Sequence, residues 1–237
     1  MKISNFKFKI LIFLFFAFYS LFFASSANAQ VATVPQFLIS WKAQSYAPNW
    51  YGGKIFPNRG SRIEVAFELI DNGKIADISK LRVRWYINDK LVLNEKQGLG
   101  LKTYSFRVFD FPGQDIEARI SVLGYKGGDQ LDDLIIIPVV HSEAVIDAPY
   151  ASRKIGVGNN SFFAYPFFFN ISDLSKLSFQ WFANSQVSQG DVDRPQKLDL
   201  NIDKKVPKDF EINLRLKINN LSDDIDFSDN EMKFKVK

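Results

Sequence analysis

The 237-residue sequence contains no cysteine and a single histidine, His141. Without cysteine the chain cannot form a disulfide, a thiolate zinc site or a thiol nucleophile. One imidazole cannot build a multi-histidine metal site, and no Gly-x-Ser-x-Gly motif provides a serine for it to activate. We therefore expect His141 to be an ordinary solvated residue.

Pairs of carboxylates facing each other across a cleft are the remaining common catalytic arrangement, used in glycoside hydrolysis. Acidic residues are plentiful, with 26 in the whole chain. However, those in the alternating segments described below occupy the outward positions expected of a solvated face. We therefore predict a protein that is not an enzyme.

Long apolar stretches are absent after residue 30, whereas one lies before it. Three lysines (Lys2, Lys7 and Lys9) precede the uncharged run 10–24, and the small residues of segment 25–29 follow. This order is typical of a secretory signal peptide over residues 1–29, cleaved after Ala29. As a helix the run spans about 22 Å, less than the roughly 30 Å hydrocarbon core of a bilayer. We expect export to the periplasm, cell surface or medium, with an uncleaved anchor as the alternative.

Removal of residues 1–29 changes the charge balance. The whole chain has a formal charge of +4, but residues 1–29 contain three lysines and no acid, so the mature chain has +1. The basic character therefore belongs largely to the targeting segment and does not indicate a nucleic-acid partner. The expected partner is a protein or glycan at the cell surface, of unknown identity.

A repeat with an offset of 96 residues divides the mature chain. Segment 77–86 (DISKLRVRWY) matches segment 173–182 (DLSKLSFQWF), with identical Asp, Ser, Lys, Leu and Trp. A repeat of this length is the size of a small domain. The sequence therefore predicts two homologous domains, over residues 30–142 and 143–237, joined by a short link with limited hinge motion.

Both halves alternate apolar and polar residues with a period of two, as in segments 63–69, 116–122, 210–219 and 232–237. This period is typical of antiparallel strands with one face buried and one solvated. Turn-forming residues separate these segments, and no stretch of the mature chain shows a sustained helical period. The pattern predicts an all-β fold of two antiparallel β-sandwiches, with about seven short strands in each.

Segments 81–85 (LRVRW) and 177–181 (LSFQW) resemble the third strand of immunoglobulin-like domains, whose tryptophan fills the space between the two sheets. The turn 109–113 (FDFPG) is similar to turns of PKD-type, Big-type and other bacterial immunoglobulin-like modules of exported surface proteins. The resemblance implies tandem immunoglobulin-like domains with Trp85 and Trp181 as structural core residues, and it implies a fold rather than an activity. The cystine of antibody domains is absent, so packing must replace its stabilisation.

Aromatic residues are concentrated at the start of the mature chain. Trp41 shares the period of a first strand with Phe37 and Ile39, so we expect it to face the core. Trp50 and Tyr51 lie between Pro48 and two glycines, in a predicted loop. Exposed aromatic side chains stack on sugar rings or form protein-binding hot spots. Trp50 and Tyr51 are therefore the candidate ligand-binding residues.

The acidic run 222–231 (SDDIDFSDNE) is predicted to form a polar loop before the last strand. Asp223, Asp224, Asp226 and Asp229 offer the hard oxygen ligands that Ca²⁺ prefers. Neither this run nor the corresponding segment 129–133 has the ligand spacing of an EF-hand. A weak calcium site and a solvated hairpin tip both remain open, and no other cofactor is expected.

The function expected from these features is that of an exported, non-enzymatic surface or envelope protein, used for adhesion, spacing or assembly. Two alternatives remain. One is a carbohydrate-binding module that uses Trp50 and Tyr51. The other is a periplasmic pilus-type chaperone, which also has two such domains and donates an exposed strand to its client, although the sequence shows no clear match to its anchoring basic pair.

Overall fold

The computed structural model describes residues 34–128, 130–188 and 190–237. The predicted signal peptide and Asp129 lie outside the described residues. Within these ranges the regular structure is β-strand, apart from two short 3-10 helices, η1 (Tyr125–Gly127) and η2 (Leu174–Lys176). In the described ranges no helix is long and apolar enough to cross a membrane.

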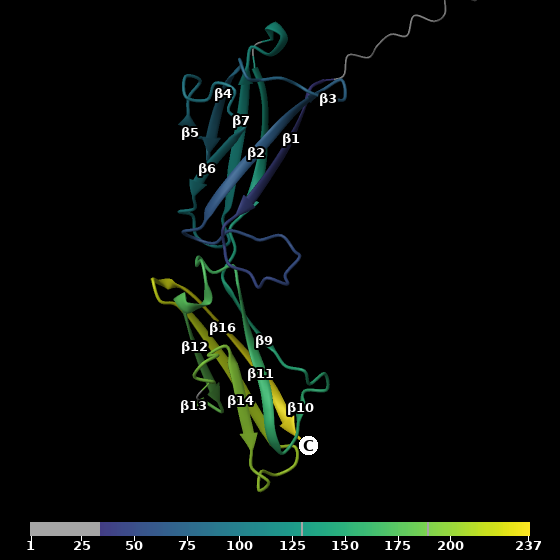
Figure 1. Ribbon diagram of the computed structural model, residues 1–237, viewed down its shortest axis with the longest axis vertical. Coiled ribbons are helices and arrows are strands. Elements are labelled where there is room, and N and C mark those ends of the chain that lie inside the picture. Colours follow the sequence, from purple (N-terminus) through teal and green to yellow (C-terminus); the bar gives the residue numbers. More distant parts are fainter. Residues whose placement is uncertain (1–33, 129, 189) are drawn as a thin grey trace, which may run out of the picture.

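The N-terminal half forms two antiparallel sheets (Figure 1). In the first sheet β2 pairs with each of the other strands, and the members are β1 (Gln36–Ala43), β2 (Arg62–Asp71), β3 (Lys74–Ile75) and β6 (Thr103–Arg107). The second sheet has the order β5-β4-β7-β8 and consists of β4 (Arg82–Ile87), β5 (Lys90–Leu93), β7 (Asp115–Leu123) and β8 (Gln130–Pro138). We call this pair of sheets the N-terminal sandwich.

The C-terminal half repeats the arrangement, and we call it the C-terminal sandwich. Its first sheet has the order β14-β11-β9 and consists of β9 (Glu143–Asp147), β11 (Gly158–Phe167) and β14 (Lys197–Ile202). Its second sheet has the order β10-β16-β15-β12-β13 and consists of β10 (Lys154–Ile155), β12 (Leu177–Ala183), β13 (Gln186–Ser188), β15 (Glu211–Asn220) and β16 (Asp223–Val236). The pairing of β10 with β16 is parallel, and the other pairings are antiparallel.

Strand order shows that both sandwiches are immunoglobulin-like. A four-strand sheet in the N-terminal half and a three-strand sheet in the C-terminal half each face a sheet whose four main strands follow the order C′-C-F-G of that fold. The register keeps the repeat offset, because Trp85 is opposite Ile120 and Trp181 is opposite Leu216. The all-β, immunoglobulin-like fold class is therefore confirmed, whereas the domain boundary between residues 142 and 143 stays a prediction.

Each sandwich encloses its own hydrophobic cluster around one indole. Trp85 is 0% exposed and Trp181 is 1% exposed. Their Nε1 atoms donate hydrogen bonds to the carbonyl oxygens of Leu101 and Pro195, both at 3.3 Å. Burying the polar edge of each ring therefore leaves no unsatisfied donor.

The prediction of a polar loop over residues 222–231 is wrong. The turn is limited to Leu221 and Ser222, and β16 runs without interruption from Asp223 to Val236. The pairing with β15 keeps one register from Phe227 to Lys235 and shifts only at the start of β16, where Asn219 is opposite Phe227 and Asn220 is opposite Asp223. Apolar residues occupy even positions at Met232 and beyond but odd positions at Ile225 and Phe227, so the sequence resembles an interruption where the strand continues. In the N-terminal half, residues 132 and 133 likewise lie within β8.

Candidate functional site

The start of β16 places polar and apolar side chains on unexpected faces. Asp226 points inward and its residue is only 6% exposed, whereas Ile225 and Phe227 are 57% and 52% exposed. Burying a carboxylate is unfavourable unless donors surround it. This part of the strand lies at the junction of the two sandwiches (Figure 1), where such donors are available.

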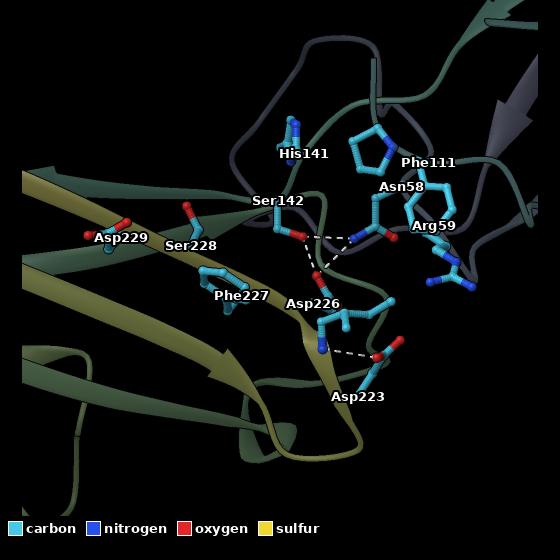
Figure 2. A pocket seen from close by; sticks show the side chains of 12 residues that line it. Asn58, Arg59, Phe111, His141, Ser142, Asp223, Asp226, Phe227, Ser228 and Asp229 are labelled. Atoms are coloured by element: carbon cyan, nitrogen blue, oxygen red, sulfur yellow. Dashed lines mark hydrogen bonds between the residues drawn. The ribbon is translucent and has the colours of Figure 1, made fainter. Parts of the chain in front are cut away.

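The carboxylate of Asp226 accepts four hydrogen bonds, two from each half of the chain. From the N-terminal half, Asn58 Nδ2 donates to Oδ1 at 2.9 Å and Ser142 Oγ donates to the same oxygen. From the C-terminal half, the backbone N–H of Asn170 (3.0 Å) and Asn220 Nδ2 (2.9 Å) donate to Oδ2. Figure 2 shows Asn58, Ser142 and Asp226 converging on one point. Asp226 is thus a polar anchor shared by the two sandwiches.

Asn58 is held in place by its own turn. Its backbone N–H donates to Ser61 Oγ at 3.1 Å, and Ser61 Oγ donates to Asn58 Oδ1 at 3.0 Å. Gly60 has φ +87°, a backbone conformation that favours glycine, and a Cβ atom there would also displace the Asn170 side-chain amide, whose Nδ2 would lie at 2.5 Å. The turn therefore presents the Asn58 amide to Asp226 in a fixed orientation.

Tyr46 joins the two sandwiches through its backbone and its ring. Its N–H donates to the carbonyl oxygen of Phe169 at 2.8 Å, and its carbonyl oxygen accepts from the N–H of Phe168 at 2.6 Å. The ring packs against the core of the C-terminal sandwich, and this burial raises the pKa of the Tyr46 phenol. A residue of the N-terminal half is therefore part of the other core.

Trp50 and Tyr51 lie in the loop between β1 and β2, as the sequence predicts, and the loop folds onto the C-terminal sandwich. Edge-to-face contacts join Trp50 to Tyr165 (5.2 Å between ring centroids) and Tyr51 to Phe167 (5.2 Å) and Phe168 (6.2 Å). Trp50 nevertheless remains 60% exposed, whereas Tyr51 is half-buried. Both residues therefore contribute to the junction, and Trp50 also offers a free aromatic surface.

A pocket of about 510 Å³ opens beside the Asp226 anchor, and Figure 2 shows it from close by. It is lined by residues of both sandwiches, among them Asn58, Arg59, Phe111, Pro112, His141, Ser142, Asp223, Ile225, Asp226 and Phe227. The Arg59 guanidinium lies 4.4 Å from the centroid of the Phe111 ring. The pocket thus combines an apolar wall with charged groups at its rim, and it exists only while the two sandwiches keep this arrangement.

The four aspartates of the predicted calcium site have separate roles. Asp226 is surrounded by donors, Asp229 pairs with Arg215 at 2.6 Å, and Asp223 accepts from the backbone N–H of Ile225 at 3.2 Å. Asp224 is exposed. In the part of the chain that the structure describes, no three carboxylate or imidazole groups gather as metal ligands. Calcium binding by this run stays a prediction that no contact supports.

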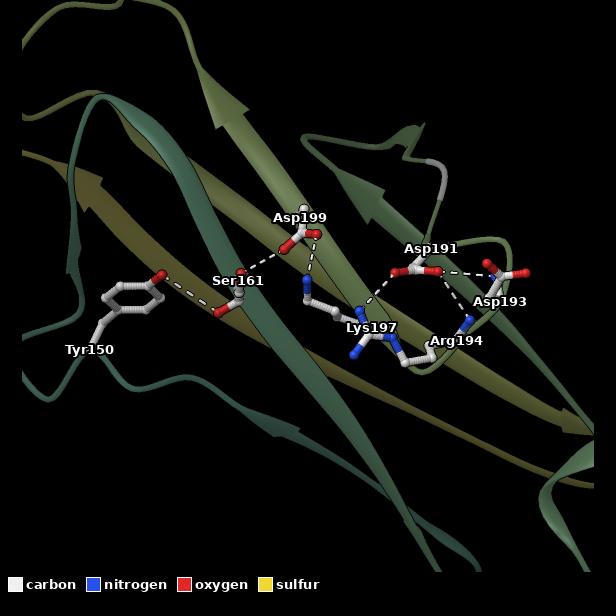
Figure 3. Close-up of polar contacts among 7 residues, drawn as sticks. All are labelled: Tyr150, Ser161, Asp191, Asp193, Arg194, Lys197 and Asp199. Carbon is white, nitrogen blue, oxygen red and sulfur yellow. Dashed lines mark hydrogen bonds and ion pairs between the residues drawn. The ribbon is translucent and has the colours of Figure 1, made fainter.

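A second group of charged residues lies on the C-terminal sandwich (Figure 3). Asp199 accepts hydrogen bonds from Lys197 Nζ (2.6 Å) and Ser161 Oγ (2.5 Å), which lower the pKa of its carboxyl group in that order of importance. Asp191 accepts from the backbone N–H of Asp193 and of Arg194. These contacts hold the segment that leads to Pro195, whose carbonyl oxygen accepts the hydrogen bond from Trp181. The charged group therefore has a structural role in the C-terminal sandwich.

No protein-family model matches the chain, and no curated protein sequence matches it. Among solved structures, it is similar to the three N-terminal domains of the outer capsid protein Hoc of bacteriophage RB49, with 11% identity over 85% of this chain and 59% of that chain and a TM-score of 0.43. It is also similar to the ICAM-5 D1–D4 ectodomain fragment (8% identity, 84% and 53% covered, TM-score 0.30) and to the glucan-utilisation protein SGBP-B of Bacteroides ovatus (13%, 86% and 47%, TM-score 0.25). The chain spans about half to three fifths of these structures. Because these TM-scores are below 0.5, the similarities say nothing about the function of this chain. The fold assignment rests on the strand pairing.

Proposed function

We propose that this protein is an exported, non-enzymatic module of the cell surface or envelope, in which two immunoglobulin-like domains of the PKD or Big kind form a rigid spacer for adhesion or assembly. The domains are residues 30–142 and 143–237. The observation that carries the proposal is the buried carboxylate of Asp226, which is satisfied by donors from both halves at once.

Rigidity follows from the cost of separating the sandwiches. Opening the junction removes Asn58 and Ser142 from a buried carboxylate, and hydrogen bonds to charged groups contribute about 1.5–3 kcal/mol each. It also breaks two backbone hydrogen bonds of Tyr46 and uncovers aromatic surface. Domains joined only by a linker move relative to each other by default. Here the junction has the features of a packed interior, which supports a fixed orientation.

The proposal is tested by measuring the distance between the two sandwiches in solution. Because the chain has no cysteine, Lys96→Cys and Lys204→Cys introduce two unique sites for spin labels, and both lysines are exposed. We expect a narrow distance distribution that broadens in Asn58→Ala/Ser142→Ala. A broad distribution in the otherwise unaltered protein would refute rigidity.

A matched control removes an Asn–Ser contact inside one sandwich. Asn219 Nδ2 donates to Ser178 Oγ at 3.4 Å, within the C-terminal sandwich. Asn219→Ala/Ser178→Ala should leave the distribution narrow. Export is tested separately by fractionation and by mass spectrometry of the mature N-terminus, for which the expected first residue is Gln30.

Carbohydrate binding is a second candidate because Trp50 is 60% exposed while its position is fixed by contacts with Tyr165 and Phe167. A rigid, exposed indole is suited to stacking on a sugar ring. A glycan-array signal that is lost in Trp50→Ala and kept in Trp50→Phe would support this function. An array without signal would remove it.

A further inference from the structure

The end of the C-terminal sandwich that points away from the junction is strongly basic. Figure 1 shows this end beside the chain end marked C. Eight exposed cations lie on it: Arg153, Lys154, Lys204, Lys205, Lys208, Lys233, Lys235 and Lys237. Against these stand three acids, Asp203, Asp209 and Glu211, which leaves a formal charge of +5. The mature chain as a whole has only +1, so its positive charge is concentrated here.

These cations are placed close to one another and outnumber the anions beside them. Lys154 in β10 is directly opposite Lys235 in β16, and like charges directly opposite each other in a sheet are destabilising. Glu211 is the neighbour of Lys235 on its other side. In the described ranges, only Lys233 of the eight cations forms an ion pair, at 3.4 Å from Glu211. The arrangement therefore costs folding stability, which points to a role other than folding.

The surface is also concave. A notch of about 250 Å³ is lined by Ser152, Arg153, Lys154, Glu211, Lys233, Phe234 and Lys235. Lys233 and Lys235 of β16 and Lys237, which directly follows this strand, lie along one face at intervals of about 6.6 Å, the two-residue repeat of a strand. The cations thus form a row beside a notch.

The equivalent end of the N-terminal sandwich is covered by the C-terminal sandwich, whereas this end of the C-terminal sandwich is exposed. With the offset of 96, Asn58 corresponds to Lys154, and each lies four residues before the equivalent strands β2 and β11, which begin at Arg62 and Gly158. In the N-terminal sandwich this end is covered, because Asn58 contacts Asp226 of the other half. In the C-terminal sandwich the corresponding residues are exposed.

We propose that the basic end binds an acidic polysaccharide, whose chain lies along the lysine row of β16 and places a carboxylate or sulfate group in the notch. Closely spaced cations raise the local concentration of a polyanion, and binding releases the counterions that are condensed on the polyanion. A linear polymer can follow a row and enter a notch, whereas a bilayer surface cannot enter one. The inference goes beyond the spacer function and does not depend on it.

The test is titration of the full mature protein with polygalacturonate in about 0.15 M NaCl, with neutral dextran as the blank. Lys154→Gln/Lys235→Gln should weaken binding about tenfold and lower the slope of log K against log salt by about two. Lys74→Gln/Lys96→Gln makes the same change in net charge on exposed lysines of the other sandwich, and it should change the affinity less than twofold. Circular dichroism confirms that each variant is folded.

Three outcomes would overturn the proposal. Equal losses in the two variant pairs would mean that only net charge matters. Failure of the unaltered protein to bind polygalacturonate would exclude the polymer. Tighter binding to vesicles of 70% phosphatidylcholine and 30% phosphatidylglycerol, or to a 20-base-pair DNA duplex, would assign the surface to a lipid or a nucleic acid instead. None of these results bears on the distance measurement that tests the rigid junction.

Discussion

Replacing Asp226 by alanine should destabilise the protein more than any other single change at the junction. The carboxylate is buried and accepts four hydrogen bonds. Removing one partner from a buried charged network costs about 3–5 kcal/mol, because the remaining groups lose their partner in a place that water does not reach. We therefore expect Asp226→Ala to lower the free energy of unfolding by about 3–5 kcal/mol.

A double-mutant cycle separates the contribution made across the junction from the total. Asn58 and Asn220 each donate to Asp226 at 2.9 Å, the first from the other sandwich and the second from the same one. Because the two bonds are alike in chemistry and length, each cycle with Asp226→Ala should give a coupling energy of about 1.5–3 kcal/mol. The measurement is urea unfolding followed by tryptophan fluorescence, since each core contains one buried indole.

The two cycles lead to different conclusions if they disagree. Coupling energies below about 0.5 kcal/mol lie within the additivity error of such cycles. If the Asn58 cycle gives such a value while the Asn220 cycle shows coupling, the sandwiches do not touch at this point in solution. That result would refute the reasoning about the junction while leaving the C-terminal sandwich intact. Absence of coupling in both cycles would mean that Asp226 is solvated.

Three further predictions concern other parts of the molecule. Trp85→Ala and Trp181→Ala should each destabilise their own sandwich by about 3–5 kcal/mol, and unchanged urea midpoints would contradict the core assignment. Hydrogen bonding from the Arg84 guanidinium lowers the pKa of Glu95 from 4.5 to about 2. The stability that ionised Glu95 provides is therefore complete above pH 4.5 and is lost as the pH falls towards 2. Glu95→Gln should flatten this part of the plot of unfolding free energy against pH. Lys154→Glu should raise stability by about 0.2–1 kcal/mol, since it replaces a repulsive cross-strand pair with an attractive one; a gain that persists undiminished in about 1 M salt would show that electrostatics is not the cause.

The fold could be predicted because its signals are local. Alternation with a period of two, turn residues between the alternating segments, and the repeated tryptophan strand together determine an antiparallel sandwich. The two indoles, at the same offset of 96 as the surrounding matches, occupy equivalent buried positions. Each of these signals needs only a short window of sequence.

The junction could not be predicted in the same way. Asn58 and Asp226 are 168 residues apart, and nothing in either neighbourhood indicates that the two meet. Trp50 and Tyr51 were identifiable as unusual loop aromatics, but their contacts with residues 165–168 depend on how the sandwiches are placed. One signal was available: the aromatic run at 167–169 continues beyond the alternating pattern of its strand, which indicates a surface covered by something else.

In the acidic run 222–231, the alternation of apolar and polar residues does not indicate which side chains face inward. Residues 226, 228 and 230 face inward like Phe234, although all three are polar. They face inward because each has a hydrogen-bond partner there. Ser228 Oγ accepts from the backbone N–H of Ala144, and Asn230 Nδ2 donates to the carbonyl oxygen of Ala144. Where inward positions are hydrogen-bonded instead of packed, the sequence loses its alternation while the strand continues.

The two copies of the repeat differ in chemistry at a position where their backbones make equivalent hydrogen bonds, since Pro57 accepts from the N–H of Val140 and Arg153 from the N–H of Lys235. The segment before the second strand reads Pro57-Asn58-Arg59 in one copy and Arg153-Lys154-Ile155 in the other. Where the end of the sandwich is covered, an amide meets a buried carboxylate without bringing a second charge into the interior, which limits the desolvation cost. Where the end is exposed, a lysine keeps its charge in water at little cost. The same position of the same fold therefore serves an internal junction in one copy and, by our proposal, an external partner in the other.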